Sequence, residues 1–214
     1  MRIPLIYPKI PSPQNCPLKQ CIAFEKLDGT NIHWKYTPNV GWTHFGTRRT
    51  EFTLDSDGVS DFRNTHPELV DAPDIFLKSF TGIVNNPPQE IILFTEFLGA
   101  NSFAGTHLLN EQHKLVLFDA LSGGKIMNPS DFLNAFCTFN PPELYEDGFD
   151  LPKIVYKGKY TGQFVEDVRN GKYNVNEGVV VKGVVNREVY MTKIKTNAYM
   201  ENLKNKSEDK WKEY

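Results

Sequence analysis

Short apolar runs separated by turn residues recur along most of the chain, which is the pattern of β-strands. Seven such runs predict strands at 22–24, 32–36, 42–45, 91–94, 115–118, 179–181 and 189–191. The second and third flank a turn with proline and glycine, as in a hairpin or meander. The fourth and fifth are continuously apolar, so we expect them in the middle of a sheet.

Helical patterns interrupt these runs at four places. Apolar residues recur close to every 3.6 positions within 59–84. Asn128, followed by a proline and an acidic first turn, marks the start of another helix. Helices are also expected over 161–171 and over the charged tail at 197–214. Together these elements predict an α+β fold with mainly antiparallel sheets and flanking helices.

The length of 214 residues predicts a single domain over 1–214 with one sizeable core, preceded by a proline-rich, extended lead-in at 1–19. No apolar run approaches the roughly 20 residues that cross a bilayer. The first residues lack the apolar region of a signal peptide, so we expect a cytoplasmic protein without a membrane partner. Three cysteines without a CxxC spacing favour reduced thiols over disulfides or a zinc site.

The formal net charge of -2 by itself argues mildly against a nucleic-acid partner, but the positions of the charges along the chain matter more. Lysines gather within 153–159 and again at Lys182, Lys193 and Lys195. A basic face on a nearly neutral protein is therefore compatible with the sequence.

The sharpest candidate for chemistry is Lys26, which ends an apolar strand and precedes the turn residues Asp28 and Gly29. The strand fixes the lysine beside the core, and the glycine allows a close backbone approach to a ligand. A lysine is nucleophilic only when neutral, and burial or neighbouring cations can lower its pKa from about 10.4 by several units. The simpler explanation is a surface lysine before a turn.

Three further residues stand at the ends of apolar runs. Glu96 could meet ribose hydroxyls or a hydrated metal ion, or form an edge salt bridge. Phe118 could stack on a base or pack in the core. Glu177, before a glycine and a valine run, could hold Mg²⁺ through water.

Lys193 and Lys195 are two residues apart on a predicted strand, so both should project to one face. Two like charges on a half-buried strand are unfavourable unless they meet a negative group, and a triphosphate meets that need. The same cations would help to keep Lys26 neutral. A solvated outer face is the alternative.

These segments, taken in order, resemble the motifs of the covalent nucleotidyltransferase superfamily, which contains DNA ligases, RNA ligases and mRNA-capping guanylyltransferases. Six segments carry the resemblance: Lys26-Leu27-Asp28-Gly29, Phe45-Gly46-Thr47-Arg48-Arg49-Thr50, Phe94-Thr95-Glu96-Phe97-Leu98-Gly99, Leu115-Val116-Leu117-Phe118-Asp119, Glu177-Gly178-Val179-Val180-Val181-Lys182 and Lys193-Ile194-Lys195. They span almost the whole chain.

The resemblance implies an adenylation domain and assigns roles to single residues. Lys26, Lys193, Lys195 and Asp28 would be catalytic. The nucleotide would be bound by Glu25, Lys26, Asn31, Arg49, Arg48, Glu96, Phe118, Glu177, Val180, Lys193 and Lys195. Arg49 is the preferred phosphate contact and Arg48 the alternative, and Val180 would lie beneath the base. Glu177 and Glu96 would hold Mg²⁺ or Mn²⁺ through water.

Asn31, two residues after Gly29, makes the first motif similar to that of RNA ligases that seal breaks in duplex RNA. The resemblance therefore implies an ATP-dependent RNA ligase of RNA repair, with a lysyl-AMP intermediate and a nicked RNA duplex or RNA/DNA hybrid as substrate. Alternatives are a DNA nick ligase, a capping guanylyltransferase or a non-catalytic nucleic-acid-binding module. Only residues 196–214 follow Lys195, which predicts a minimal catalytic core whose strand binding a partner protein or domain could supply.

Overall fold

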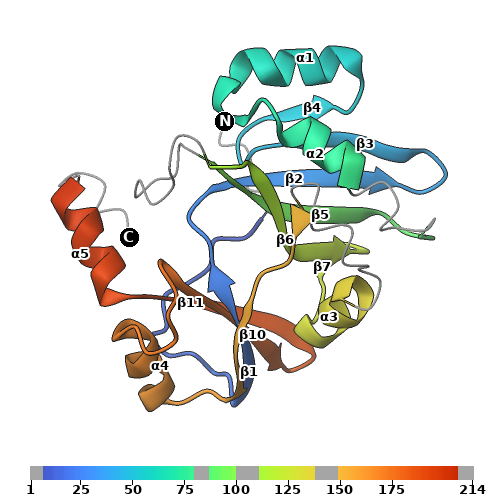
Figure 1. Cartoon of the computed structure of the whole chain (residues 1–214). Coiled ribbons are helices and arrows are strands. Elements are labelled where there is room, and N and C mark those ends of the chain that lie inside the picture. Colours follow the sequence, from blue (N-terminus) through green and yellow to red (C-terminus); the bar gives the residue numbers. More distant parts are fainter. Residues whose placement is uncertain (1–6, 80–86, 100–110, 138–148, 207–214) are drawn as a thin grey trace. The chain divides into compact units, whose positions relative to one another are not determined.

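A computed structural model describes residues 7–79, 87–99, 111–137 and 149–206 (Figure 1). The described residues form two compact units, and the chain passes from one to the other more than once. The described residues of unit 1 lie within Met1–Lys9, Gly29–Ser102 and His107–Leu151, and those of unit 2 lie within Ile10–Asp28 and Pro152–Tyr214.

Unit 1 is built on a seven-stranded sheet. Its order is β4 (Glu51–Thr53), β3 (Gly41–Gly46), β2 (Thr30–Thr37), β5 (Ile91–Leu98), β6 (Lys114–Ser122) and β7 (Lys125–Ile126), with β8 (Phe149–Asp150) also paired to β6. All pairs are antiparallel except β6 with β8. The predicted strands at 32–36, 42–45, 91–94 and 115–118 are confirmed.

One face of this sheet carries the core of unit 1. Alternate residues of β2, Ile32 and Trp34, pack with Phe76 from the helical region and with apolar residues of β5 and β6. The helices of this unit are α1 (Ser56–Thr65), the 3₁₀ turn η1 (Pro67–Leu69), α2 (Ala72–Ser79) and α3 (Pro129–Cys137). Figure 1 shows α1 and α2 beside the strands β2, β3 and β4.

The helical prediction for 59–84 is confirmed in part, because the segment divides into three short pieces. A proline begins η1, and another occupies the first turn of α2; neither residue has a backbone N–H to extend a preceding helix. Residues 80–84 lie outside the described part of the chain. The start of α3 is as predicted, since the Asn128 side chain accepts a hydrogen bond from the Ser130 N–H at 2.8 Å.

Unit 2 is built on a four-stranded antiparallel sheet. The strand order is β11 (Glu188–Lys195), β10 (Gly178–Val185), β1 (Gln20–Lys26) and β9 (Ile154–Lys159). Helix α4 (Gly162–Arg169) covers one face through Phe164, Val165 and Val168, and α5 (Asn197–Lys206) follows β11. Thr161 caps α4 by accepting from the Phe164 N–H at 3.1 Å. The predicted strands, the helix near 161–171 and the helical start of the tail are confirmed, while 207–214 lie outside the described residues.

The expectation of one sizeable core is wrong. Buried residues form two large clusters, one in each unit, because each sheet buries one apolar face against its own helices. The prediction of a single domain over 1–214 stays a prediction.

From Tyr7 the lead-in has no helix or strand before Gln20, but it turns at Gln14 and Asn15, so the extended form is confirmed only in part. Pro11 joins it to β11. The Pro11 carbonyl accepts hydrogen bonds from the Lys193 N–H at 3.0 Å and from the Thr192 hydroxyl at 3.1 Å. Cys16 and Cys21 are free thiols, and burial raises the pKa of Cys21 to about 11. Among the described helices, none has the length and apolar character to cross a membrane.

Candidate functional site

Lys26 is the last residue of β1 and lies on the sheet face opposite α4. Side chains alternate along a strand, so Ala23 and Val179 face the helix while Phe24 and Lys26 face away. The pairing register puts Lys26 opposite Gly178 of β10, and Gly178 opposite Lys195 of β11. Lys26 and Lys195 therefore belong to one row that crosses three strands.

A single buried carboxylate joins the two lysines. Glu177, which is 2 % exposed, directly precedes β10. Its Oε2 accepts from Lys26 Nζ at 2.7 Å, and its Oε1 accepts from Lys195 Nζ at 3.0 Å. The structure thus brings these three candidate residues together. Two cations and one anion leave this cluster with one positive charge when both amines are protonated.

Gly178 lies between the two lysines, and its backbone conformation requires a glycine. Gly178 has a φ of +149°, a conformation that side chains rarely allow. A Cβ at this position would collide with the backbone oxygen of Ile194 in β11. The glycine thus permits β11 to lie close to β10 where the charge cluster forms.

Tyr199 of α5 supports the cluster from the other side. Lys195 Nζ lies 4.7 Å from the centre of the Tyr199 ring, and the Tyr199 hydroxyl donates to Asp28 at 3.2 Å. Burial lowers the pKa of Lys195, and the charge of Lys26 lowers it further, while Glu177 and Asp28 act in the opposite direction. This amine is therefore easier to deprotonate than an ordinary lysine.

The same face carries the remaining predicted residues of the two central strands. Val180 pairs with Phe24 on one side and with Lys193 on the other, so these three side chains form the next row. Lys182 follows on β10, nearly fully buried, with Nζ 5.4 Å from the Phe24 ring centre. Glu25 alternates to the opposite face, where burial raises the pKa of its carboxyl. The structure thus does not bring the Glu25 side chain to Lys26.

In unit 1, Glu96 and Asn31 lie side by side on neighbouring strands. They are register partners in β5 and β2. Glu96 Oε1 accepts from the Gly29 N–H at 3.1 Å. A Cβ on Gly29 would collide with the backbone oxygen of Phe97, so only glycine allows this approach. The bond ties the residue that begins unit 1 to the carboxylate predicted to bind a nucleotide.

Phe118 lies at an irregularity of β6 that removes it from the core. Phe94 pairs with Asp119 and Thr95 with Leu117, so Phe118 is an extra residue in the ladder, as in a β-bulge. Its ring is half-buried and is not a member of the core cluster of unit 1. Tyr7 packs edge-on against Phe118 with ring centres 5.2 Å apart, and against Phe94 at 4.8 Å.

The Tyr7 hydroxyl donates to Asp119 Oδ2 at 2.9 Å. Both residues are buried, and burial together with the Asp119 charge raises the pKa of Tyr7 well above 10.0. Arg48 opposes this shift, so its charge acts at Tyr7 beside Phe118. Arg48 and Arg49 are both exposed in the loop between β3 and β4, where the Arg49 N–H donates to Thr47 at 3.4 Å.

Sequence reasoning missed Tyr7 and Tyr199, whereas it had grouped Lys182 with Lys193 and Lys195. No pattern marks either tyrosine, since each reaches its partner through a long-range contact.

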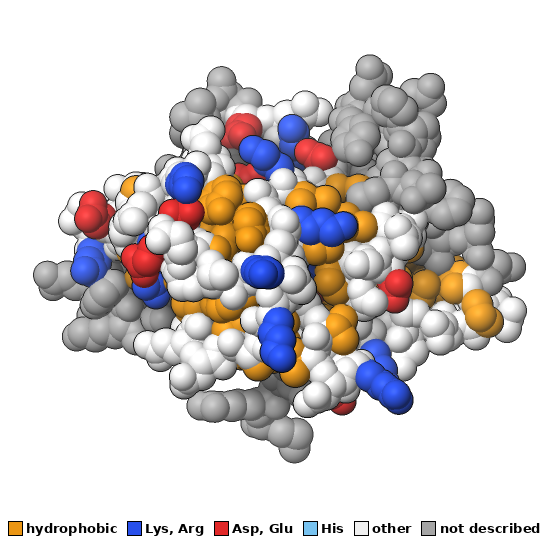
Figure 2. Space-filling model, turned by 90° about the horizontal axis from the view of Figure 1, so that it is seen from below, with side chains coloured by type: hydrophobic (Ala, Val, Ile, Leu, Met, Phe, Trp, Pro, Cys, Tyr) orange, Lys and Arg blue, Asp and Glu red, His pale blue; other side chains and the backbone are white. Residues whose placement is uncertain are grey.

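Basic side chains also occupy part of the molecular surface. Figure 2 shows Lys and Arg side chains in the middle of one face among hydrophobic side chains, whereas the Asp and Glu side chains in this view lie nearer its rim. Basic and acidic side chains are therefore unevenly distributed on this face.

Comparison with known proteins adds a family and a set of similar folds. Residues 19–195 match the family model described as RNA ligase. No curated protein matches the chain.

Solved structures of Naegleria gruberi RNA ligase are similar in fold. The one with PPi has a TM-score of 0.60 and 16% identity, covering 92% of this chain and 58% of that chain. An apo point mutant has a TM-score of 0.61 and 15% identity, covering 94% of this chain and 58% of that chain. A point mutant with ATP and Mn has a TM-score of 0.56 and 16% identity, covering 88% of this chain and 52% of that chain. This chain thus spans less than two thirds of the length of these proteins, and the likeness shows a common fold.

Proposed function

Because the chain belongs to the RNA ligase family, we propose that it is an ATP-dependent RNA ligase in which Lys26 becomes covalently joined to AMP. One observation carries this proposal: the amines of Lys26 and Lys195 share the buried carboxylate of Glu177, at 2.7 Å and 3.0 Å. The segments of the chain that resemble ligase motifs supply these three residues.

The charge of this cluster favours a nucleophilic amine. A protonated lysine cannot attack phosphorus, so one proton must leave. Two ammonium groups that share one carboxylate repel each other, and the loss of one proton brings the cluster to neutrality. The proton can leave from either amine and be exchanged between them through Glu177.

We propose that unit 2 binds the phosphates of ATP. Lys193 and Lys195 lie on the same face of their sheet as Lys26 and can neutralise the charge of a triphosphate. In unit 1, the half-buried ring of Phe118 offers a stacking surface.

Asn31 and Glu96 offer polar groups to the ribose or the base. Arg49, with Arg48 as the alternative, would contact a phosphate, and both arginines are exposed in the loop between β3 and β4. Val180 would lie under the nucleotide beside Lys193. Asp28 would act through Tyr199 and Lys195.

A divalent cation fits this site only with water and phosphate as further ligands. Among the described residues, no three His, Cys, Asp or Glu side chains are grouped to hold a metal ion. Mg²⁺ usually keeps several waters and takes one or two carboxylates. Glu177, a buried carboxylate already in contact with two cations, suits this role, and Glu96 is the second candidate. When bound, Mg²⁺ or Mn²⁺ would offset the charge that develops on the phosphates.

The proposed reaction has three balanced steps. Lys26 Nζ loses a proton and attacks the α-phosphorus of ATP, and the bond to the β-phosphate breaks with release of pyrophosphate. An oxygen of an RNA 5′-phosphate then attacks the AMP phosphorus, and the amine leaves and regains a proton. Finally a 3′-hydroxyl loses its proton and attacks the 5′-phosphorus, which forms the phosphodiester and releases AMP. Lys193 and Lys195 stabilise the charge in the first step.

We further propose a cytoplasmic role in RNA repair, with a nicked RNA duplex or RNA/DNA hybrid as substrate. Asn31 after Lys26-Leu27-Asp28-Gly29 supports RNA over DNA. A partner protein or domain could assist in holding the strands. Comparison of nicks with RNA or DNA at the 3′-hydroxyl tests this choice, and preferential sealing of DNA would make the chain a DNA nick ligase.

The decisive test is covalent labelling with α-³²P ATP and Mg²⁺. We expect a labelled protein that carries AMP on Lys26 by mass spectrometry, and no label in Lys26→Ala. Lys172→Ala is the matched control, since Lys172 is an exposed lysine of the same unit, paired with Asp167. Persistent labelling of Lys26→Ala would remove the proposal, and label from GTP alone would favour a capping enzyme.

The two lysines of β11 provide a second arm of this test. Lys193→Ala and Lys195→Ala should each slow labelling by roughly 10²-fold, the effect of losing one preorganised donor to a developing charge. Unchanged rates in both variants would show that this strand does not face the phosphates. RNA binding without any labelling would support a non-catalytic module.

A further inference from the structure

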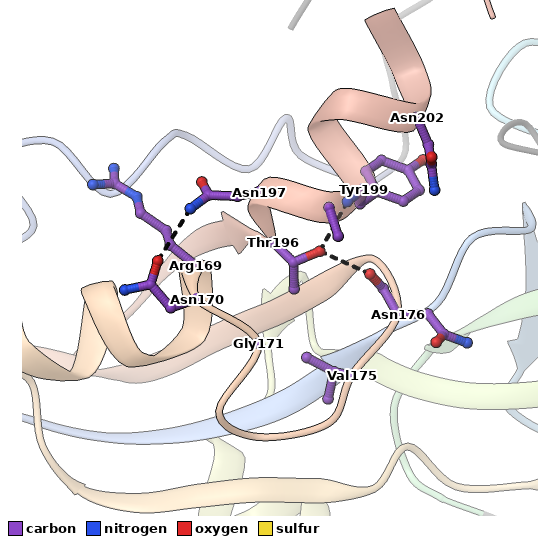
Figure 3. Close-up of a pocket in the computed structure, with 10 residues that line it drawn as sticks. Arg169, Asn170, Gly171, Val175, Asn176, Thr196, Asn197, Tyr199 and Asn202 are labelled. Carbon is purple, nitrogen blue, oxygen red and sulfur yellow. Dashed lines mark hydrogen bonds between the residues drawn. The ribbon is translucent and has the colours of Figure 1, made fainter. Parts of the chain in front are cut away.

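Unit 2 contains a second polar site, a hollow of about 580 Å³ that includes none of Lys26, Glu177 and Lys195 in its lining (Figure 3). It lies between the end of α4, the segment that leads to β10 and the first turns of α5. The side chains that define its chemistry are those of Arg169, Asn170, Asn176, Asn197, Tyr199 and Asn202. Figure 3 shows Arg169 and Asn202 at opposite sides of the group.

The lining combines four carboxamides with one guanidinium, and it contains no carboxylate. Carboxamides both donate and accept hydrogen bonds, so they suit a ligand with polar edges of both kinds. A guanidinium binds phosphate oxygens with a planar fork. A volume of this size accepts a ligand of small-molecule dimensions. A nucleotide unit, with one phosphate, a ribose and a base, has this combination.

Capping and helix stability account for only some of the polar residues that line the hollow. Asn170 is the C-cap of α4, and the Asn197 side chain donates to it at 3.2 Å. Asn202 lies inside α5 and is exposed. An asparagine in a helix interior is less favourable than alanine, so the helix itself does not require it. The ion pair of Arg169 with Glu166, at 2.7 Å, is exposed on both sides, and such a pair is easily exchanged for a phosphate.

The hollow is joined to the charge cluster by consecutive residues. Asn176 precedes Glu177, and Thr196 follows Lys195. Thr196 holds both segments together, since its hydroxyl donates to the Asn176 carbonyl at 2.9 Å and its N–H donates to the Glu177 carbonyl at 2.9 Å. Tyr199 lines the hollow and contacts Lys195. A strand that reaches Lys26 could therefore be held at this second point of unit 2.

We propose that this hollow binds one nucleotide of the RNA substrate, with Arg169 on a backbone phosphate and the carboxamides, including Asn202, on the base and ribose. The inference rests on the proposed ligase function. Phosphate contacts position a strand, and contacts to base edges add selectivity, which is how single-stranded RNA is usually recognised.

The test is fluorescence anisotropy with a labelled, 5′-phosphorylated single-stranded RNA, without ATP. Arg169→Gln should weaken binding about tenfold, the effect of losing a hydrogen bond to a charged group. It should also reduce the slope of log affinity against log salt by about one. Arg187→Gln is the matched control, because Arg187 lies in the turn between β10 and β11 and does not line the hollow. Its affinity should equal that of the wild type.

Asn202→Ala separates binding from folding. It should weaken RNA binding by about 2-fold to 10-fold while the melting temperature stays equal or rises, because alanine is the better helix former. Labelling by α-³²P ATP is measured in parallel on every protein. Wild-type RNA affinity in both Arg169→Gln and Asn202→Ala would overturn the inference, whereas absence of label from the wild type would overturn the ligase function instead.

Discussion

Substitution of Glu177 by glutamine tests the charge cluster directly. Glutamine keeps the shape but removes the negative charge that Lys26 and Lys195 share. Its amide nitrogen would also turn two hydrogens toward one of the ammonium groups. The side chain of Lys195 is 9% exposed and cannot reach water easily, whereas that of Lys26 is 22% exposed. The variant therefore removes the negative charge nearest to both amines, one of which is largely buried.

The loss of one partner from a buried ion pair costs about 3–5 kcal/mol. We expect a value of about 3 kcal/mol for Glu177→Gln, because Lys26 is partly exposed and can be hydrated. For a chain of this length, each kcal/mol lowers the melting temperature by about 2–4 °C, so the expected decrease is roughly 6–12 °C. Labelling by ATP should be lost as well, since Glu177 is assigned to the nucleophile and the metal.

The assay is urea unfolding at pH 7 followed by far-UV circular dichroism. Glu188→Gln is the control, because Glu188 is exposed at the start of β11 and should change stability by less than about 0.5 kcal/mol. The double variant Glu177→Gln with Lys195→Gln should be less destabilised than the sum of the single variants, since the buried charge is removed together with its partner. Equal stability of Glu177→Gln and the wild type would refute the reasoning.

Two further predictions concern unit 1 and the whole chain. Tyr7→Phe removes the hydrogen bond to buried Asp119 and should lower the free energy of unfolding by about 1–3 kcal/mol in urea titrations. Because folding raises the pKa of Tyr7, the unfolded chain loses this proton at a lower pH than the folded chain does. The wild type should therefore lose stability with rising pH more steeply than Tyr7→Phe above about pH 10. Equal slopes of stability against pH would contradict this. A single domain should unfold in one step. In Trp211→Phe, where the remaining tryptophans Trp34 and Trp42 belong to unit 1, fluorescence and circular dichroism should give the same midpoint. Two midpoints would show independent units.

The strands could be predicted from the sequence because each is apolar and ends at a turn residue. The close approach of Lys26, Glu177 and Lys195 followed from motif resemblance, and the sheet register gives the physical reason for it. The division into two cores could not be predicted, because strand patterns do not reveal which strands pair. β1 pairs with β10 rather than with β2, the strand that follows it in the chain.

Contacts of high sequence separation explain the other misses. Tyr7 and Asp119 are 112 positions apart, and Tyr199 and Asp28 are 171 apart. The binding of a nucleotide by Glu25 stays a prediction, and the register shows only that its side chain faces away from the charge cluster. Since Lys26 faces the charge cluster, its neighbour on the strand must face the other way.

Gly178, which lies between Lys26 and Lys195, allows the spacing of the charged groups to be changed without changing the groups themselves. Replacement of Gly178 by alanine would leave every ionisable group in place, yet it would force β11 away from β10, because the new methyl group meets the Ile194 carbonyl. Such a protein would hold the same acids and bases at altered spacing. A comparison of its labelling rate with that of a lysine variant would tell how much of the reactivity comes from the distance between the amines rather than from their presence.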